Sequence, residues 1–150
     1  MTKRLHPVAG ALALLTILAF WTATVVSELS GDPAAVLAVK TAILQGLVVL
    51  VPAMAAVGIT GMRLGGRARH PLVAAKRRRM PVIAANGLLV LAPAAVYLQA
   101  KAAAGAFDSS FLLVQAVEFV AGAVNIALLG LSFRDGLRLK GRIGRAPTAA

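Results

Sequence analysis

The chain has 150 residues and no cysteine; 59% of the residues are hydrophobic, 14% are charged, and the formal net charge is +11. A soluble domain carries about 25% charged residues, so this composition leaves too little polar surface to cover a soluble globule. The absence of cysteine excludes a disulfide framework, a thiol nucleophile and a thiolate metal site. The high apolar content excludes intrinsic disorder. The composition is that of an integral membrane protein.

Four apolar segments follow one another along the chain, and Glu118 is the only charged residue in their central parts. Each segment is long enough to cross a bilayer core of about 30 Å as a helix. Lipid offers no partner to backbone groups outside a helix or a closed barrel, and the alternating segments of a barrel are absent. We therefore expect one all-α domain, an up-down antiparallel bundle of four transmembrane helices over about residues 7–28, 38–62, 81–100 and 110–133.

Basic residues are divided unevenly between the two sides of this expected bundle. All but two of the sixteen Lys and Arg residues fall at the N-terminus, in the loop of residues 63–80 or in the tail of residues 134–150. Basic loops of membrane proteins stay in the cytoplasm. The pattern predicts a protein of the inner (plasma) membrane whose two termini and basic loop are cytoplasmic.

Within the basic loop, Pro71 and the apolar residues after it favour a short interfacial helix. The basic run beside the expected third span is predicted to bind acidic lipid headgroups, at about 1 kcal/mol per residue; it consists of Lys76, Arg77, Arg78 and Arg79. Nucleic acid is not an expected partner, because the chain has no aromatic interleaving, zinc pattern or soluble recognition helix.

Polar side chains inside the spans are the candidates for chemistry, since each costs free energy in lipid unless it is paired or faces a cavity. At 100° per residue, Gln115 and Asn125 share a helix face with Glu118. We expect an intramembrane cluster with the two asparagines in the inner half of the membrane and the other members in the outer half or at its boundary: Glu118, Gln115, Asn125, Gln45, Tyr97, Lys40 and Asn86.

Glu118 has two interpretations that the sequence leaves open. Polar and small residues hold membrane helices together, so this carboxylate is a candidate for helix association. Glutamine would make similar hydrogen bonds at a lower desolvation cost, which favours a functional carboxylate that handles a proton or a cation. Lys40 either pairs with Glu118 or extends outward to water.

Two histidines are expected at the cytoplasmic surface, where His6 precedes Pro7 and His70 precedes Pro71. Paired imidazoles are the axial ligands that b-type haem requires, so haem b bound by His6 and His70 is one hypothesis. The alternative places His6 before the first helical residue, where proline is favoured, and leaves His70 as a solvated loop residue. No other cofactor and no metal are predicted.

The common catalytic motifs are absent: there is no GxSxG, HExxH or P-loop. We therefore expect no catalytic residues and favour a protein that is not an enzyme, without excluding one. The lead hypothesis is an accessory or assembly subunit of a larger membrane complex, respiratory complexes included, or a homo-oligomer. In size and topology alone, the chain resembles the small four-helix anchor and assembly subunits of bacterial respiratory complexes. The alternatives are a small proton-coupled transporter or carrier that uses Glu118, and an electron-transfer subunit that uses His6 and His70 with haem b or quinone.

Overall fold

The computed structural model describes residues 2–65, 70–139 and 141, without the side chains of residues 2–7, 57 and 60–65. The described part is helical and contains no strand. Its elements are α1 (Thr2–Ser30), α2 (Pro33–Gly65), α3 (Pro71–Asn86), the π-helical turn η1 (Gly87–Leu91), α4 (Ala92–Ala103) and α5 (Ser109–Leu139).

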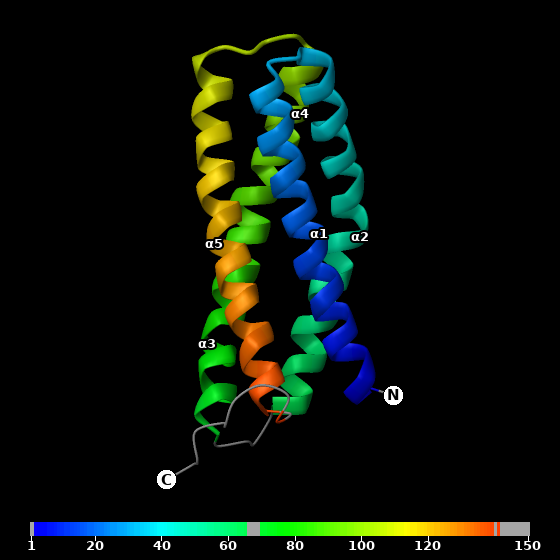
Figure 1. Ribbon diagram of the computed structural model, residues 1–150, viewed down its shortest axis with the longest axis vertical. Coiled ribbons are helices and arrows are strands. Elements are labelled where there is room, and N and C mark those ends of the chain that lie inside the picture. The colour runs from blue at the N-terminus through cyan, green and yellow to red at the C-terminus, as the bar shows by residue number, and fades with distance from the viewer. Residues whose placement is uncertain (1, 66–69, 140, 142–150) are drawn as a thin grey trace.

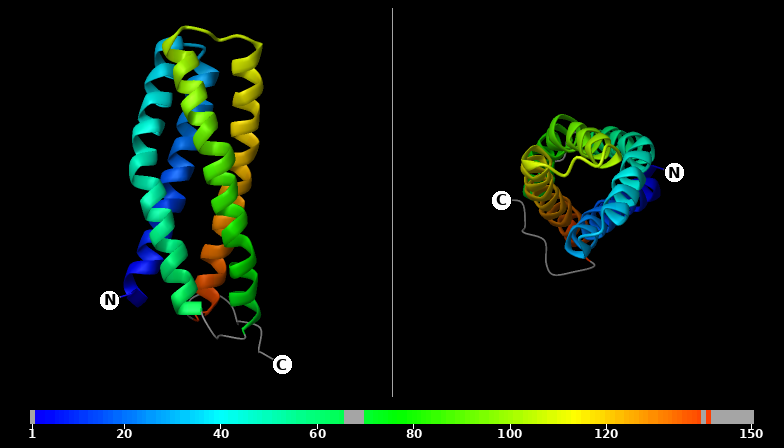
Figure 2. Two further views of the ribbon diagram at one scale, coloured as in Figure 1. Left: turned by 180° about the vertical axis from the view of Figure 1, so that it is seen from behind. Right: turned by 90° about the horizontal axis from the view of Figure 1, so that it is seen from above.

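These elements form four antiparallel rods, because α3, η1 and α4 follow one another without a break (Figure 1). Figure 2 shows the rods seen from above, arranged around a square. α1 packs against α2 and α5, and α4 packs against both α2 and α5. Neighbours in sequence are therefore neighbours in space, as expected for an up-down bundle.

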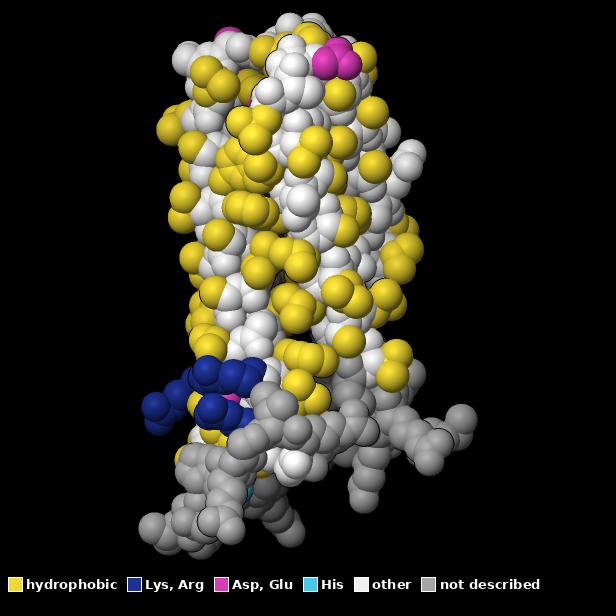
Figure 3. All heavy atoms as spheres, viewed as in Figure 1, with side chains coloured by type: hydrophobic (Ala, Val, Ile, Leu, Met, Phe, Trp, Pro, Cys, Tyr) yellow, Lys and Arg dark blue, Asp and Glu magenta, His cyan; other side chains and the backbone are white. Residues whose placement is uncertain are grey.

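All four rods are long and apolar enough to cross a membrane, over Val8–Ser30, Pro33–Ala56, Pro71–Ala103 and Ser109–Leu139. Their lengths and composition indicate a multi-pass membrane protein. Large apolar side chains cover the outside of the bundle (Figure 3), and Leu29, Val48 and Leu89 are each at least 75% exposed. Such a surface suits an apolar solvent.

The two ends of the bundle differ in their connections and charge. At the loop end, defined by residues 31–32 and 104–108, Gly31 and Gly105 adopt φ of 66° and allow tight turns. Asp108 caps the N-terminus of α5: its Oδ1 accepts a hydrogen bond from the backbone N–H of Phe111 at 3.0 Å. The opposite, basic end, defined by the beginning of α3 and the end of α5, carries clustered arginines and lysines (Figure 3).

The helices of the third and fourth rods extend well beyond the expected spans. Residues 71–80 belong to α3 instead of a loop, and residues 134–139 continue α5 instead of starting the tail. The expected boundaries followed the charges, but Lys and Arg are good helix formers. Charge limits how deep a residue lies in lipid and does not end a helix. The predicted interfacial helix after Pro71 is thus the first part of the third rod.

The third rod contains a wide turn at η1. The N–H of Ala92 bonds the carbonyl of Gly87, five residues earlier. This turn ends two residues before Pro93, which has no N–H to donate and whose ring crowds the preceding turn of a regular helix. Local π-helical adjustments of this kind accommodate proline in long helices.

Candidate functional site

A buried ion pair joins α2 to α5 near the loop end. Lys40 Nζ donates to Glu118 Oε2 at 2.5 Å, and the side chains are 0% and 12% exposed. Gln115, one turn before Glu118, donates from Nε2 to the same oxygen at 3.0 Å. Of the two positions considered for Lys40, the structure has the inward one, paired with Glu118. Because a lone ion in an apolar interior is costly, the two charges depend on each other.

α1 adds a second carboxylate to this region. Glu28 is half-buried in the last turn of α1, within electrostatic range of Lys40 and Glu118. Thr24 and Ser27 are buried on the same side of α1, and Ser27 Oγ donates to the Thr24 carbonyl at 3.1 Å. Glu28 was not among the predicted site residues, because it lies at the expected end of the first span. The four-residue spacing of Thr24 and Glu28 was the available signal, since it puts both on one helix face.

The two predicted inner asparagines are in contact. Asn86 Nδ2 donates to Asn125 Oδ1 at 2.9 Å and to the carbonyl of Ala121 at 2.8 Å. Asn125 is 2% exposed and its Nδ2 lies 3.5 Å from the carbonyl of Ile83. These bonds join α3 to α5 and form a second polar layer, separate from the ion pair.

Two predicted members do not join the cluster. Gln45 is exposed on the outside of α2, because five residues after the buried Lys40 the helix has turned by about 140°. Tyr97 is 38% exposed, directly before the buried Leu98, and its hydroxyl donates to Ser110 Oγ at 2.8 Å. The outer group and the inner pair of asparagines expected from their depths are therefore an ion-pair layer and an asparagine layer, with Gln45 and Tyr97 outside both.

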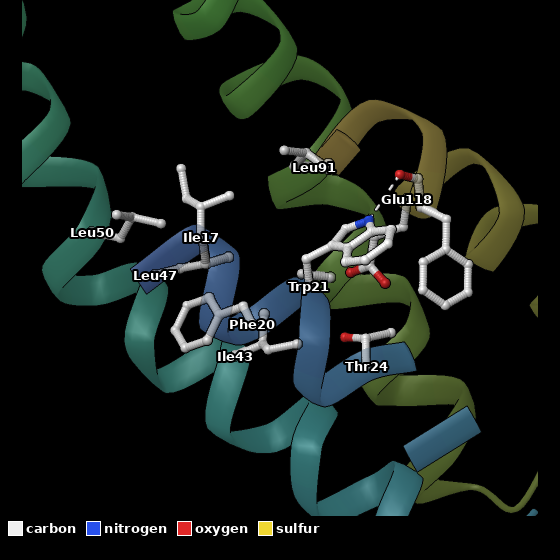
Figure 4. A pocket seen from close by; sticks show the side chains of 12 residues that line it. Ile17, Phe20, Trp21, Thr24, Ile43, Leu47, Leu50, Leu91 and Glu118 are labelled. Carbon is white, nitrogen blue, oxygen red and sulfur yellow. Dashed lines mark hydrogen bonds between the residues drawn. The ribbon is translucent and has the colours of Figure 1, made fainter. Parts of the chain in front are cut away.

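A cavity of about 70 Å³ lies beside the ion pair, between α1, α2, η1, α4 and α5 (Figure 4). Among the described residues that line it, Glu118 is the only charged one. Trp21 closes one side: its Nε1 donates to the carbonyl of Phe119 at 3.1 Å, and its ring meets the Phe119 ring edge-on at 6.0 Å. The remaining lining is largely apolar and includes Ile17, Phe20, Ile43, Leu47, Leu50, Leu91 and Ala95.

The basic end contains another ion pair, which was not among the predicted sites. Arg79 donates to Asp135 Oδ2 at 2.6 Å, and the Asp135 side chain is 2% exposed. Arg134 lies 3.6 Å from the other carboxylate oxygen. Arg79 thus joins α3 to α5, while Arg77 and Arg78 of the predicted headgroup-binding run are exposed. Asp135 was missed because it was counted among the charges of the tail.

The haem hypothesis stays a prediction. His70 caps α3: its Nδ1 accepts the backbone N–H of Leu72 at 3.2 Å, ahead of Pro71 at the first helical position. His70 is thus a half-buried capping residue and not a freely solvated one. The side chain of His6 lies outside the described residues. Among the described residues, no group of three His, Cys, Asp or Glu side chains is placed to hold a metal ion.

The fold and these layers indicate a class: an all-helical bundle of four rods, each long and apolar enough to span a membrane, with polar layers between the rods. Comparison with protein-family models, curated protein sequences and solved structures gave no match to this chain.

Proposed function

We propose that the chain is a non-catalytic membrane subunit that associates with another transmembrane helix through the outside of α2. The observation that carries this proposal is the position of Gln45, an amide that faces outward from a helix long and apolar enough to span a membrane. Polar side chains that face lipid are rare because they leave hydrogen-bonding groups unpaired.

Gln45 lies within a continuous exposed strip, which we call the α2 strip. Successive members are four or three residues apart, the spacing that keeps residues on one helix face. The α2 strip consists of Ala38, Ala42, Gln45, Val49, Pro52 and Ala56, all exposed. Small residues let a second helix approach closely, and this combination of small side chains with one amide is typical of associating membrane helices.

The amide of Gln45 has an unmet capacity for hydrogen bonds. No described residue of the chain forms a hydrogen bond with the Gln45 side chain. An amide on a neighbouring helix would supply both a donor and an acceptor, and such an interhelical bond contributes about 0.6–2 kcal/mol. In a homodimer, Gln45 would pair with Gln45 of the second copy across a two-fold axis. In a larger complex, it would pair with a polar residue of another subunit.

The location belongs to the same proposal. With the basic end in the cytoplasm, the exposed Arg77 and Arg78 lie at the level of acidic headgroups, which their charge favours. In this orientation the protein lies in the inner membrane with both termini in the cytoplasm, as the positive-inside rule predicts. The rival hypothesis of a transporter driven by Glu118 alone is less favoured, because Lys40 already neutralises that carboxylate.

Cross-linking in native membranes tests the association, and the chain has no cysteine to interfere. We expect Ala42→Cys to give a cross-linked adduct in cell membranes. The matched control is Leu113→Cys on α5, an exposed position away from the α2 strip. Equal cross-linking at both positions, or none at Ala42, would contradict the proposal. The adduct mass distinguishes a second copy from a different subunit.

Gln45→Leu tests the contribution of the amide. Loss of one interhelical hydrogen bond of about 0.6–2 kcal/mol weakens association about 3- to 30-fold. Fluorescence energy transfer between labelled copies in nanodiscs, or co-purification with the cross-linked partner, measures this change. Val48→Leu, an apolar change at an exposed position of the same helix, is the control.

A further inference from the structure

The charges near the loop end do not balance. The loop-end charge cluster, defined as Glu28, Lys40 and Glu118, combines two carboxylates with one ammonium, brought together by α1, α2 and α5. Lys40 is completely buried and Glu118 nearly so. With both carboxylates ionised, the cluster carries one negative charge in largely apolar surroundings, which is costly.

No other described cation compensates this charge. The neighbouring groups from α4 and the connection after it are Tyr97, Lys101 and Asp108, and Lys101 pairs with Asp108 at 2.6 Å. Asp32, in the turn between α1 and α2, is exposed and accepts the backbone N–H of Ala34 at 3.0 Å. The remaining described charges lie in the basic end of the bundle.

Two buried oxygens of the cluster region lack a hydrogen-bond donor among the described residues: Glu28 Oε1 and Gln115 Oε1. Gln115 is 4% exposed, and its Nε2 holds the amide against Glu118. Unpaired buried acceptors are rare in native proteins and each calls for an explanation. Within the described part of the chain, both oxygens therefore lack a hydrogen-bond donor, and the cluster lacks a second positive charge to balance its two carboxylates.

We propose that the loop-end charge cluster is a proton-binding site, in which Glu28 carries one exchangeable proton taken from water at the loop end. The added proton makes the cluster neutral. It also turns one carboxylate into a hydroxyl donor, which the surrounding acceptors lack. Glu28 is the member that exchanges the proton, because it is half-exposed in the last turn of α1 while Lys40 and Glu118 hold each other. This inference is independent of the association through the α2 strip.

Infrared spectroscopy of the purified protein in nanodiscs tests the site directly, since a protonated carboxyl absorbs apart from a carboxylate. The chain has only five Asp and Glu residues, so each band is assignable by substitution. We expect the wild type to retain one protonated side-chain carboxyl at pH 7, and Glu28→Gln to remove its band entirely. Asp32→Asn, a neighbouring exposed acid, is the matched control and leaves the band unchanged.

Lys40→Met provides a second test that does not depend on the folding of Glu28→Gln. Without the ammonium, two carboxylates share the apolar site, so the protonated band at pH 7 should about double. Three results would each overturn the proposal: no protonated band in the wild type, a band that survives in Glu28→Gln, or an unchanged band in Lys40→Met. Emission from Trp21, the single tryptophan beside Glu118, verifies that each variant is folded.

Discussion

Gly122 allows α1 and α5 to approach each other at Trp21. A Cβ atom added to Gly122 would lie 2.8 Å from Cδ1 of the Trp21 ring. The ring is fixed by its hydrogen bond to the Phe119 carbonyl at 3.1 Å and by the edge-on contact with Phe119. Gly122→Ala therefore forces the indole to withdraw by about 0.6 Å, to the 3.4 Å at which ordinary contacts begin.

Two effects lower the free energy of unfolding of Gly122→Ala. Overpacking costs about 1–3 kcal/mol, and the lower value applies because the adjoining cavity of about 70 Å³ gives the ring room to move. Loss of the Trp21 hydrogen bond adds about 1 kcal/mol. The free energy of unfolding should therefore fall by about 2 kcal/mol, which is about 30-fold in the equilibrium constant.

The matched control is Gly130→Ala on the same helix, where an added Cβ meets no described atom within 4 Å. There alanine should be neutral, or stabilising by up to about 1 kcal/mol through helix propensity. Denaturation in mixed micelles measures both variants, and the emission maximum of Trp21, the only tryptophan, reports on the ring itself. If Gly122→Ala is as stable as Gly130→Ala and its emission is unchanged, this account of the packing is refuted.

Three further predictions concern the polar groups. Lys40→Met should lower the free energy of unfolding by about 3 kcal/mol, because it leaves Glu118 without its buried counterion; adding Glu118→Leu should recover most of the loss, and a double variant as unstable as Lys40→Met would contradict the pairing. Asn86→Leu should cost about 1–2 kcal/mol, because it leaves the buried amide oxygen of its partner without a donor; a loss below 0.5 kcal/mol by denaturation would contradict the asparagine layer. The hydrogen bonds that Asp108 accepts from Lys101, from a serine hydroxyl and from a backbone N–H hold the pKa of this carboxyl well below its usual range. The stabilisation by such a group is complete above the usual value of about 3.9 and is lost only as the pH falls through the lower folded value. The amide that Asp108 caps should therefore remain protected from hydrogen exchange at pH 4, after correction for the intrinsic rate, and Asp108→Asn is the control.

The expected fold was predictable because it depends on composition along the chain. Runs of about 20 apolar residues form helices in lipid, since no other open structure pairs their backbone groups. Short connections make neighbouring helices antiparallel. Helix ends were less predictable: α3 begins at Pro71 and α5 continues to Leu139, because basic residues remain helical where they leave the apolar layer.

The amino-acid sequence by itself determined the number of helices, their order, and the gathering of basic residues at one end, because hydropathy and charge act locally along the chain. It also identified Glu118, Gln115 and the two asparagines, which share helix faces at fixed spacing. Only the tertiary structure decided the pairing of Lys40 with Glu118, the inward position of Glu28 and the outward position of Gln45. Periodicity relates residues of one helix to one another, but the rotation of each helix about its axis depends on the packing of all four.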